Sequence, residues 1–500
     1  TTLTASALLV ALMQTATSLP AFLLSLPAGA LADMVDRRKL LLCTQGFMAA
    51  VATGLGVLTF MGGVSAFGVL GFTFLLGVGT ALNGPIWQTV TTELVPRPVM
   101  SFPMILNGVS NNIARAIGPA VGGAIIAYYS PGWVFVLNGV SFLGTWATVY
   151  FWKRTSTVTS GPAEHSIGAL HAGIRYVQYS TTIYGVLVRT FAFSFGTTAM
   201  LVSVVIARKL HLSSDTFGVM LSWMGAGAVA GAYLLGRVGA RLSLNRRAAL
   251  GALTFAGSHL ALVLITQVYV LYAVMFVSGI AWPMVMTSFS TTVQLNVPKW
   301  VQARVIGIHM LVFQAGVSLD SLMWDELADR LSLDIALLAA AGWMLGRALP
   351  ARPFPMRSGE GLNLDPLGHF PDPFSGSGID PDDDPIVVMI ECNVEPANRL
   401  SSQRAAEQLR RLRLRDGALR AGLFSDVADP RRITEFFYVP TWGEHERQHN
   451  RFTKEDQVIE VRVRQYHRGP GKSRVTHLLA FPHAPNVEVA TPMHTLESQR

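Results

Sequence analysis

The chain has 500 residues, of which 50% are hydrophobic and only 14% are charged, whereas soluble proteins carry roughly a quarter charged residues. This composition excludes an ordinary soluble protein and indicates that lipid is the solvent for much of the chain. The net charge of +8 would suit a nucleic-acid-binding protein. However, Lys and Arg lie between apolar segments and near the C-terminus, without a basic stripe interleaved with aromatic residues, so no nucleic-acid partner is expected.

Apolar segments long enough to cross a bilayer, which takes about twenty residues, fill most of residues 1–350. Five membrane-spanning helices are predicted before a polar connection: Ala7–Ala32, Leu40–Phe60, Ala66–Trp87, Met104–Tyr128 and Val134–Phe151. Six are predicted after it: Ile183–Ala207, Phe217–Leu235, Ala248–Thr266, Tyr269–Thr291, Val305–Trp324 and Ile335–Ala348. The pattern therefore predicts an all-α polytopic membrane protein over this part of the chain.

Positive charges separate the loops into two sets, as they do when short loops lie on opposite sides of a bacterial membrane. One set carries Arg37, Arg38, Lys39, Arg97, Lys153, Arg154, Arg237, Arg241, Arg246, Arg247, Lys299 and Arg304. The other set, with turns near Gly62, Pro131 and Gln267, is nearly bare apart from Arg208 and Lys209. We therefore expect a multi-pass protein of the bacterial inner membrane, with Thr1 outside and the C-terminal region in the cytoplasm.

The predicted organisation is an N-terminal half at 1–152, a cytoplasmic connection at 153–182 and a C-terminal half at 183–350. An outside start without a signal peptide suggests that one helix is missing before Thr1, which would complete a 6+6 arrangement. Transporters built from such repeats hold their substrate between the halves, near the middle of the membrane.

The character of the chain changes after residue 350, where Pro, Gly and Asp indicate a linker at 351–384 that is too polar to be packed core. Strands are predicted at 386–394, 418–424, 433–439 and 475–480, and helices at 400–414 and 454–466. This order is the ferredoxin-like pattern of a small α+β domain, placed at 385–485 and followed by a disordered tail at 486–500.

The strongest local motif is the segment from Gly29 to Lys39, GALADMVDRRK, at the end of the first predicted helix. It resembles the signature between helices two and three of the major facilitator superfamily, although Asp36 stands where the family usually has Gly. Gly29 would allow close helix approach, and Asp33 would accept charge-assisted hydrogen bonds. With the basic pair Arg37 and Arg38, these residues are predicted to gate transport; the alternative is simple positive-inside anchoring.

A second motif, RAIGPAVGG from Arg115 to Gly123, resembles the antiporter motif of drug exporters in this superfamily. Gly118, Pro119, Gly122 and Gly123 would form a flat, bendable helix face, or only a kinked packing helix. An ionisable group within an apolar helix usually faces a cavity or a partner. Arg115, Asn111 and Asn107 are therefore candidates for the substrate cavity, unless Arg115 reaches the cytoplasmic interface.

Two further sets of residues are candidates for chemistry. Asp320 lies in an apolar helix and is a candidate to carry a coupling proton, with Asp325 and Glu326 nearby. In the C-terminal domain, His445 and His449 have the spacing of a zinc-protease motif, with His467 as a conceivable third ligand. Their segment is short and strongly charged, so a solvated helix face and no metal site are expected. No Gly-rich phosphate-binding loop with Lys and Ser or Thr is present, so an ATP-driven mechanism is not expected. No cofactor is expected.

Over almost its whole length the chain resembles the transmembrane secretion effector subgroup of the major facilitator superfamily, to which the enterobactin exporter is similar. Its C-terminal domain resembles dimeric antibiotic-biosynthesis-monooxygenase-like domains through Asp416–Leu419, Glu435–Phe437, Trp442, His445 and His449. The resemblance implies a proton-coupled exporter of small amphipathic molecules, siderophore or drug-like, with a homodimer through this domain. The alternatives are a membrane-tethered enzyme with a cofactor-free monooxygenase domain and a transport-dead homologue.

Overall fold

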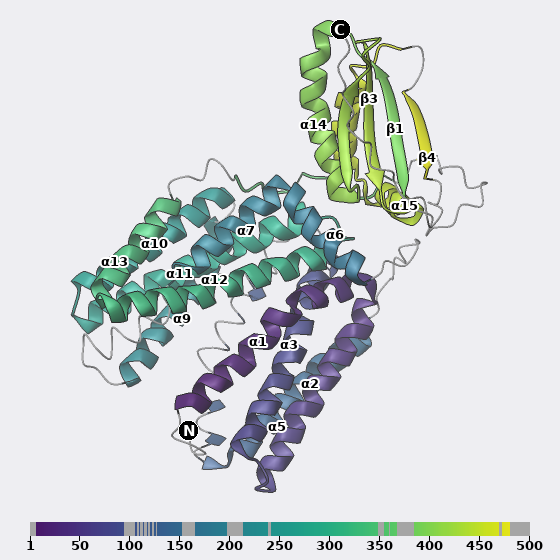
Figure 1. Cartoon of the computed structure of the whole chain (residues 1–500). Coiled ribbons are helices and arrows are strands. Elements are labelled where there is room, and N and C mark those ends of the chain that lie inside the picture. The colour runs from purple at the N-terminus through teal and green to yellow at the C-terminus, as the bar shows by residue number, and fades with distance from the viewer. Residues whose placement is uncertain are drawn as a thin grey trace, which may run out of the picture. The chain divides into compact units, whose positions relative to one another are not determined.

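The computed structural model describes residues 7–94, parts of 106–130, and residues 131–152, 166–197, 214–238, 242–348, 355–359, 361–367, 385–469 and 473–480. The chain divides into two compact units. The first unit contains residues 1–367 together with 453–455, and the second contains residues 368–452 and 456–500. The first is helical, and the second is built on a sheet (Figure 1).

Four long helices form most of the described part of the N-terminal half: α1 (Ala7–Met34), α2 (Arg37–Phe60), α3 (Ala66–Leu94) and α5 (Pro131–Phe151). Helix α1 packs on α3, and α2 packs along α5 (Figure 1). Each of these helices contains a predicted span. Most of the remaining predicted span, Met104–Tyr128, lies outside the described residues.

The C-terminal half contains α7 (Thr181–Ser194), α9 (Ser214–Val238), α10 (Leu244–Leu264), α11 (Val268–Asn296), α12 (Gln302–Arg330) and α13 (Leu333–Ala348). A helix that was not predicted, α6 (Ser166–Tyr179), lies in the connection between the halves. It buries Ala169, Ala172 and Tyr176 and packs on α12, α1 and α7. The connection is therefore partly structured.

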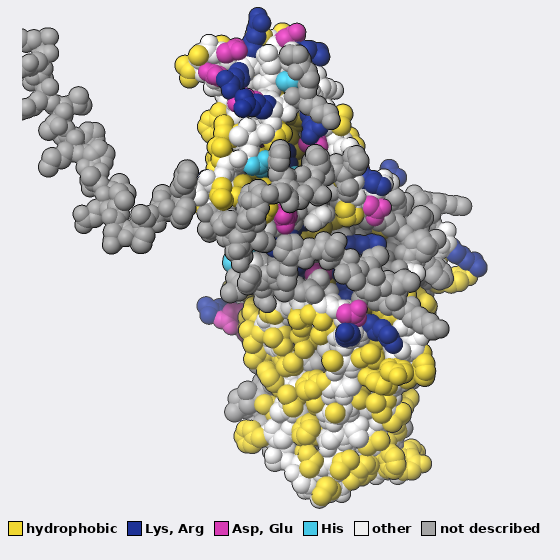
Figure 2. Space-filling model, turned by 90° about the vertical axis from the view of Figure 1, so that its right-hand side faces the viewer, with side chains coloured by type: hydrophobic (Ala, Val, Ile, Leu, Met, Phe, Trp, Pro, Cys, Tyr) yellow, Lys and Arg dark blue, Asp and Glu magenta, His cyan; other side chains and the backbone are white. Residues whose placement is uncertain are grey.

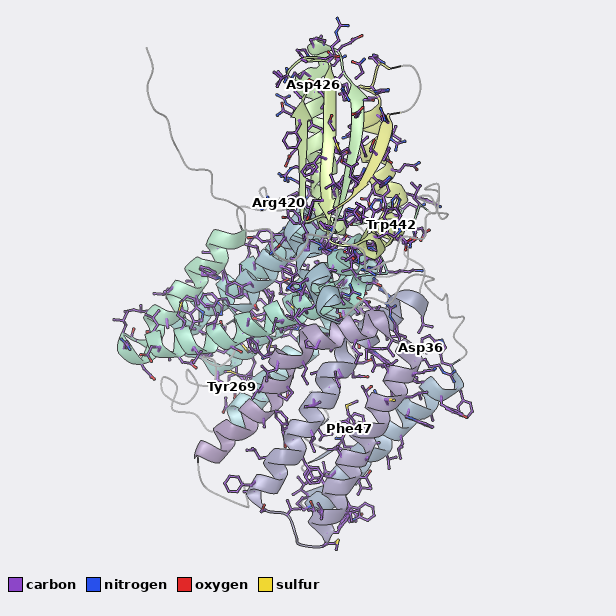
Figure 3. All side chains as sticks on the ribbon, turned by 45° about the vertical axis from the view of Figure 1, so that its right-hand side comes forward. Asp36, Phe47, Tyr269, Arg420, Asp426 and Trp442 are labelled. Atoms are coloured by element: carbon purple, nitrogen blue, oxygen red, sulfur yellow. The ribbon has the colours of Figure 1, made fainter. Side chains whose placement is uncertain are left out.

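The surface of the helical unit is suited to lipid. Seven of the described helices are long and apolar enough to cross a membrane, and α13 contains a shorter apolar stretch. Large apolar side chains such as Phe47 and Tyr269, which Figure 3 labels, are exposed on the surface of the helices. Figure 2 shows a face covered by hydrophobic side chains, with charged side chains confined to one end. The predicted multi-pass membrane fold is confirmed.

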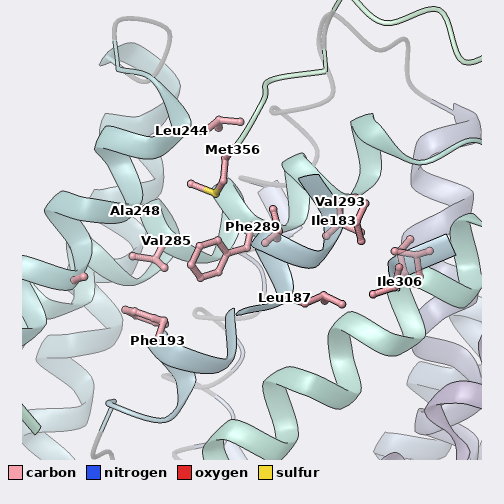
Figure 4. Close-up of a cluster of buried hydrophobic side chains, with 14 of the residues drawn as sticks. Ile183, Leu187, Phe193, Leu244, Ala248, Val285, Phe289, Val293, Ile306 and Met356 are labelled. Carbon is pink, nitrogen blue, oxygen red and sulfur yellow. The ribbon is translucent and has the colours of Figure 1, made fainter. Parts of the chain in front are cut away.

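That charged end is where α1, α5 and α11 finish and where α2 and α12 begin, and we call it the basic end because it carries Arg37, Arg38 and Arg304. The segment 355–359 packs there against α10 and α11 (Figure 4). Met356 is only 5% exposed and belongs to a core cluster with Leu244. The expectation that residues 351–384 are too polar to pack is therefore wrong for this segment, because neighbouring side chains satisfy its backbone hydrogen bonds.

The second unit is a four-stranded antiparallel sheet in the order β2-β3-β1-β4. Its elements are β1 (Ile386–Asn393), α14 (Arg399–Asp416), β2 (Arg420–Ser425), β3 (Arg432–Val439), α15 (Trp442–Arg451), α16 (Lys454–Arg464) and β4 (Arg474–Leu479). Each predicted strand and helix is present within a few residues, and the strand order is that of a ferredoxin-like sheet. Sequence reasoning did not assign α15 as a separate element.

The two faces of this sheet differ. Ile386, Val388 and Phe437 point toward Leu414 of α14 and Trp442 of α15, where they form the core of the domain. On the opposite face, the strand register aligns Val387 with Tyr438 and Leu478, and Met389 with Phe436. Phe424 of β2 lies beside them and is 58% exposed. The centre of this second face is therefore apolar and only partly buried among the described residues, whereas Arg420 and Glu391 lie toward its ends.

Candidate functional site

Asp33 joins the two halves of the helical unit. It is the penultimate residue of α1, and its side chain has 0% exposure. Its Oδ1 accepts a hydrogen bond from the backbone N–H of Ala303 at 3.1 Å, and its Oδ2 accepts one from that of Arg304 at 3.1 Å. Both donors lie in the first turn of α12, where unpaired N–H groups and the helix dipole favour an anion. Asp33 thus caps a helix of the other half.

Two guanidinium groups flank this buried carboxylate. The Nη2 of Arg37 lies 3.1 Å from Oδ1, and the Nε of Arg304 lies 3.5 Å from Oδ2. Arg37 also donates to the carbonyl of Ala32. A buried charge is tolerated only when it is paired and hydrogen-bonded, and removing a partner is strongly destabilising. We call Asp33, Arg37, Arg304 and the first turn of α12 the lock.

Gly29 lies one helical turn before Asp33, where α1 meets the first turn of α12. A Cβ atom added at Gly29 would lie 2.6 Å from the carbonyl oxygen of Ala303 and 2.9 Å from the Cα of Arg304. Those are backbone atoms, so they cannot rotate away. The absence of a side chain at Gly29 is therefore what brings the backbones close enough for Asp33 to reach α12.

Arg38 has a different role from Arg37. It donates to the carbonyls of Val149, at 3.2 Å, and Tyr150, which lie in the last turn of α5. Asp36 caps α2 by accepting the N–H of Lys39 at 3.0 Å. These contacts stay within the N-terminal half. Of the four predicted gating residues, Gly29, Asp33 and Arg37 therefore lie at the junction between halves, and Arg38 lies beside it.

The other predicted site residues are not brought to this junction. Asn111, Arg115, Pro119 and Gly123 lie outside the described residues, and Asn107 is an exposed helical position. A Cβ at Gly118 or Gly122 would meet nothing within 4 Å. Asp320 lies in α12, more than four turns beyond the lock, and is 2% exposed.

Sequence reasoning missed Arg304 of the lock and a glycine of α6 that lies against it. Arg304 was used only as one of the positive charges that predict the cytoplasmic side, although its backbone N–H and its side chain both contact Asp33. Gly173 of α6 was not considered, yet a Cβ there would lie 2.9 Å from the Cβ of Arg304. The sequence signal was the presence of two basic residues, Lys299 and Arg304, between two predicted spans.

The C-terminal half also contains an apolar cavity of about 100 Å³, lined by residues of α9, α10 and α11 and by Thr197. Its wall combines Met220, Met224 and Met275 with the aromatic rings of Phe255 and Trp282, and its polar members are Thr197, Ser258, His259 and Ser278. Such a lining suits apolar groups with few hydrogen bonds.

His445 of α15 is buried and His449 is half-buried, so the expectation of a solvated helix face is wrong. His445 is 2% exposed, and its Nε2 lies 3.1 Å from the Nε2 of His449. His477 of β4 lies next to His445, with ring centroids 5.0 Å apart. His467, the conceivable third ligand, instead accepts the N–H of Asn393. Among the described residues, no group of three His, Cys, Asp or Glu is arranged to hold a metal ion.

Burial, and then the neighbouring His449, His477 and Arg413, lowers the pKa of His445 from 6.5 to about 3. Burial and Arg413 also lower the pKa of His449 to about 4. The folded domain therefore binds fewer protons than the unfolded chain below pH 6.5, and its stability falls as the pH falls toward these values.

We expect the free energy of local unfolding of α15 to fall by about 2 kcal/mol between pH 7 and pH 5 through the pKa shift of His445 alone. Hydrogen exchange of α15 peptides in the detergent-solubilised full chain, corrected for intrinsic rates, measures this change. His445→Phe keeps a ring between Phe437 and Trp442 but does not titrate, so its pH dependence should be smaller. Equal pH dependence in both proteins would show that His445 is not responsible.

Comparisons with known proteins agree with this architecture. The profile of the transmembrane secretion effector family matches residues 1–484, which include the C-terminal sheet. The staphyloferrin A transporter of Staphylococcus aureus is 24% identical over 317 residues, covering 62% of this chain and 78% of that protein. The multidrug efflux pump Tap of Mycobacterium tuberculosis is 22% identical over 354 residues, covering 66% and 81%.

Solved structures show the same helical fold. The human organic anion transporter MFSD10 superposes with a TM-score of 0.59 at 15% identity, covering 67% of this chain and 82% of that one. The Escherichia coli fucose:proton symporter FucP superposes with a TM-score of 0.55 at 13% identity, covering 68% and 90%. These relatives and neighbours are transporters rather than enzymes. The chain belongs to the transmembrane secretion effector family and is a multi-pass transporter of the major facilitator superfamily.

Proposed function

We propose that this protein is a proton-coupled exporter of small amphipathic molecules, siderophore or drug-like, and that the lock closes its basic end during alternating access. One observation carries the proposal: a buried carboxylate of one half caps a helix of the other half. The names of the two relatives, a siderophore transporter and a multidrug efflux pump, support the substrate class. The apolar cavity with few polar groups supports an amphipathic substrate.

The chemistry of the lock suits a contact that must form and break in every cycle. While the basic end is closed, Asp33 is held by two N–H donors and two guanidinium groups. When the halves separate, water solvates the same charged groups, so opening replaces these bonds rather than leaving the charges bare. A purely apolar contact would expose surface without such compensation.

Proton coupling can be tested with the full-length protein in proteoliposomes loaded with a panel of siderophores and dyes. We expect efflux to accelerate when the side that receives the substrate is made acidic, and a protonophore should abolish the acceleration. Empty liposomes and the Asp33→Asn variant serve as controls. Efflux that is identical with and without the gradient would contradict proton coupling, and no efflux of any compound would contradict the exporter assignment.

We also propose that the basic end and the C-terminal domain are cytoplasmic, because positive loops favour that side. A second copy of this chain is the proposed partner of the open sheet face formed by Val387, Met389, Phe436, Tyr438 and Phe424, because a contiguous apolar face of this kind favours protein contact. A reporter fused after Arg500 tests the side, and cross-linking of purified protein through a Phe424→Cys substitution tests the dimer.

A further inference from the structure

Residues 355–359, which we call the strap, lie across the basic end of the C-terminal half. Met356 inserts its side chain among Leu244 of α10 and Val285 and Phe289 of α11 (Figure 4). The side-chain amide of Asn245 pairs with both backbone groups of Met356. Its Nδ2 donates to the carbonyl at 3.0 Å, and its Oδ1 accepts the N–H at 3.0 Å. An irregular buried segment needs such partners, so Asn245 makes this docking specific.

The strap also rests on the last turn of α11. The Nδ2 of Asn296 donates to the carbonyl of Arg357 at 3.0 Å. Gly359 has a φ of +70°, a conformation that disfavours other residues. A Cβ at Gly359 would lie 2.8 Å from the Cβ of Leu295 and 2.9 Å from the Nδ2 of Asn296. The strap therefore follows the end of α11 at close contact distance.

The end of α11 is connected to the lock. The carbonyl of Asn296 accepts the hydroxyl of Tyr176 of α6 at 3.3 Å, and the ring of Tyr176 packs edge-on against Trp300. One turn earlier in α6, Gly173 lies against the side chain of Arg304. The turn between α11 and α12, residues 297–301, is thus held at one end by Asn296 and leads directly into the first turn of α12 that Asp33 caps.

We propose that Asn296 is a positioning residue for the lock. It joins the docked strap to the α11–α12 turn and so holds the first turn of α12 where Asp33 can cap it. Docking of the strap therefore favours closure of the basic end, and loss of the strap contact favours opening. Because the strap lies in the chain between α13 and the C-terminal domain, a pull on the linker from that domain would act on the strap and, through Asn296, on the lock. This inference rests on the proposed gating role of Asp33.

The test uses spin-label distances across the basic end of the full chain. Lys39→Cys and Lys299→Cys place labels at exposed positions in different halves, in a background of Cys43→Ala and Cys392→Ala. Asn296→Ala removes the hydrogen bond to the strap and also one to the carbonyl of Thr292 in its own helix. The loss of the bond to the strap is expected to lower the ratio of closed to open populations about fivefold to tenfold. Gly359→Ala disturbs the same contact from the strap and should shift the ratio in the same direction.

Arg357→Ala is the matched control, because its exposed side chain is removed while its carbonyl, the acceptor for Asn296, remains. It should leave the distances unchanged. Thermal stability in detergent is measured alongside, because a merely structural role would lower stability without moving the distances. If Asp33→Asn opens the basic end but Asn296→Ala and Gly359→Ala do not, the strap proposal is wrong and the lock stands. If Asp33→Asn has no effect either, both are wrong.

Discussion

Replacing Asp33 by Asn is expected to open the basic end and to lower transport at least tenfold. The amide keeps one acceptor oxygen but loses the charge that interacts with the α12 dipole, Arg37 and Arg304. Charge-assisted hydrogen bonds are worth about 1.5–3 kcal/mol, which corresponds to a change of roughly tenfold to a hundredfold in the closed population. Initial rates in proteoliposomes and the spin-label distance across the basic end measure the two effects.

Asp36→Asn is the control for this experiment. Asp36 also accepts a backbone N–H at a helix start, but the helix is α2 of its own half. Asn caps a helix about as well as Asp, so transport should remain within about twofold of the wild-type rate. Equal losses in Asp36→Asn and Asp33→Asn would mean that the charge of the loop matters and the contact with α12 does not.

Gly29→Ala is expected to reproduce much of the effect of Asp33→Asn without removing any charged group. The added methyl group would lie 2.6 Å from the carbonyl oxygen of Ala303, so α1 and the start of α12 must move apart. The hydrogen bonds of Asp33 would then lengthen beyond useful distance. We expect transport to fall about tenfold and the closed population to fall with it, because the loss of one such hydrogen bond costs about 1.5 kcal/mol.

Gly71→Ala provides the matched control, because a Cβ at this position of α3 would meet nothing within 4 Å. Ala favours a helix over Gly, so this variant should fold and transport normally. Because Gly29 and Asp33 serve the same contact, the double variant should be little worse than either single one. Wild-type transport by Gly29→Ala would indicate that α1 and α12 are never this close in the working protein.

The membrane helices were predicted well because their signal is local. A window of about twenty apolar residues must be satisfied by lipid wherever its neighbours lie, and α2, α3, α9 and α11 each contain their predicted span. The strands of the C-terminal domain were predicted for the same reason, since alternation along a short run reports which side faces a core. Helix α6 was missed because its apolar face is too short to resemble a membrane span.

The site was predicted only in part. The motif around Asp33 showed that a carboxylate and two arginines lie within six residues of one another, but their partners did not follow from it. Arg37 pairs with Asp33, whereas Arg38 caps α5, and no sequence pattern distinguishes adjacent arginines in this way. The histidines of α15 were assigned to solvent because their own segment is polar, yet β4 supplies His477 beside them.

By itself, the sequence determined the solvent of each segment, the order of helices and strands, and the side of the membrane that its charges favour, because these depend on residues within a few turns of one another. Only the tertiary structure decided which groups meet. Asp33 accepts hydrogen bonds from N–H groups 270 and 271 residues away, and Asn245 is hydrogen-bonded to the backbone of Met356, 111 residues away. Such pairs depend on the path of the chain through the whole bundle, and a backbone donor looks the same at every position in a sequence.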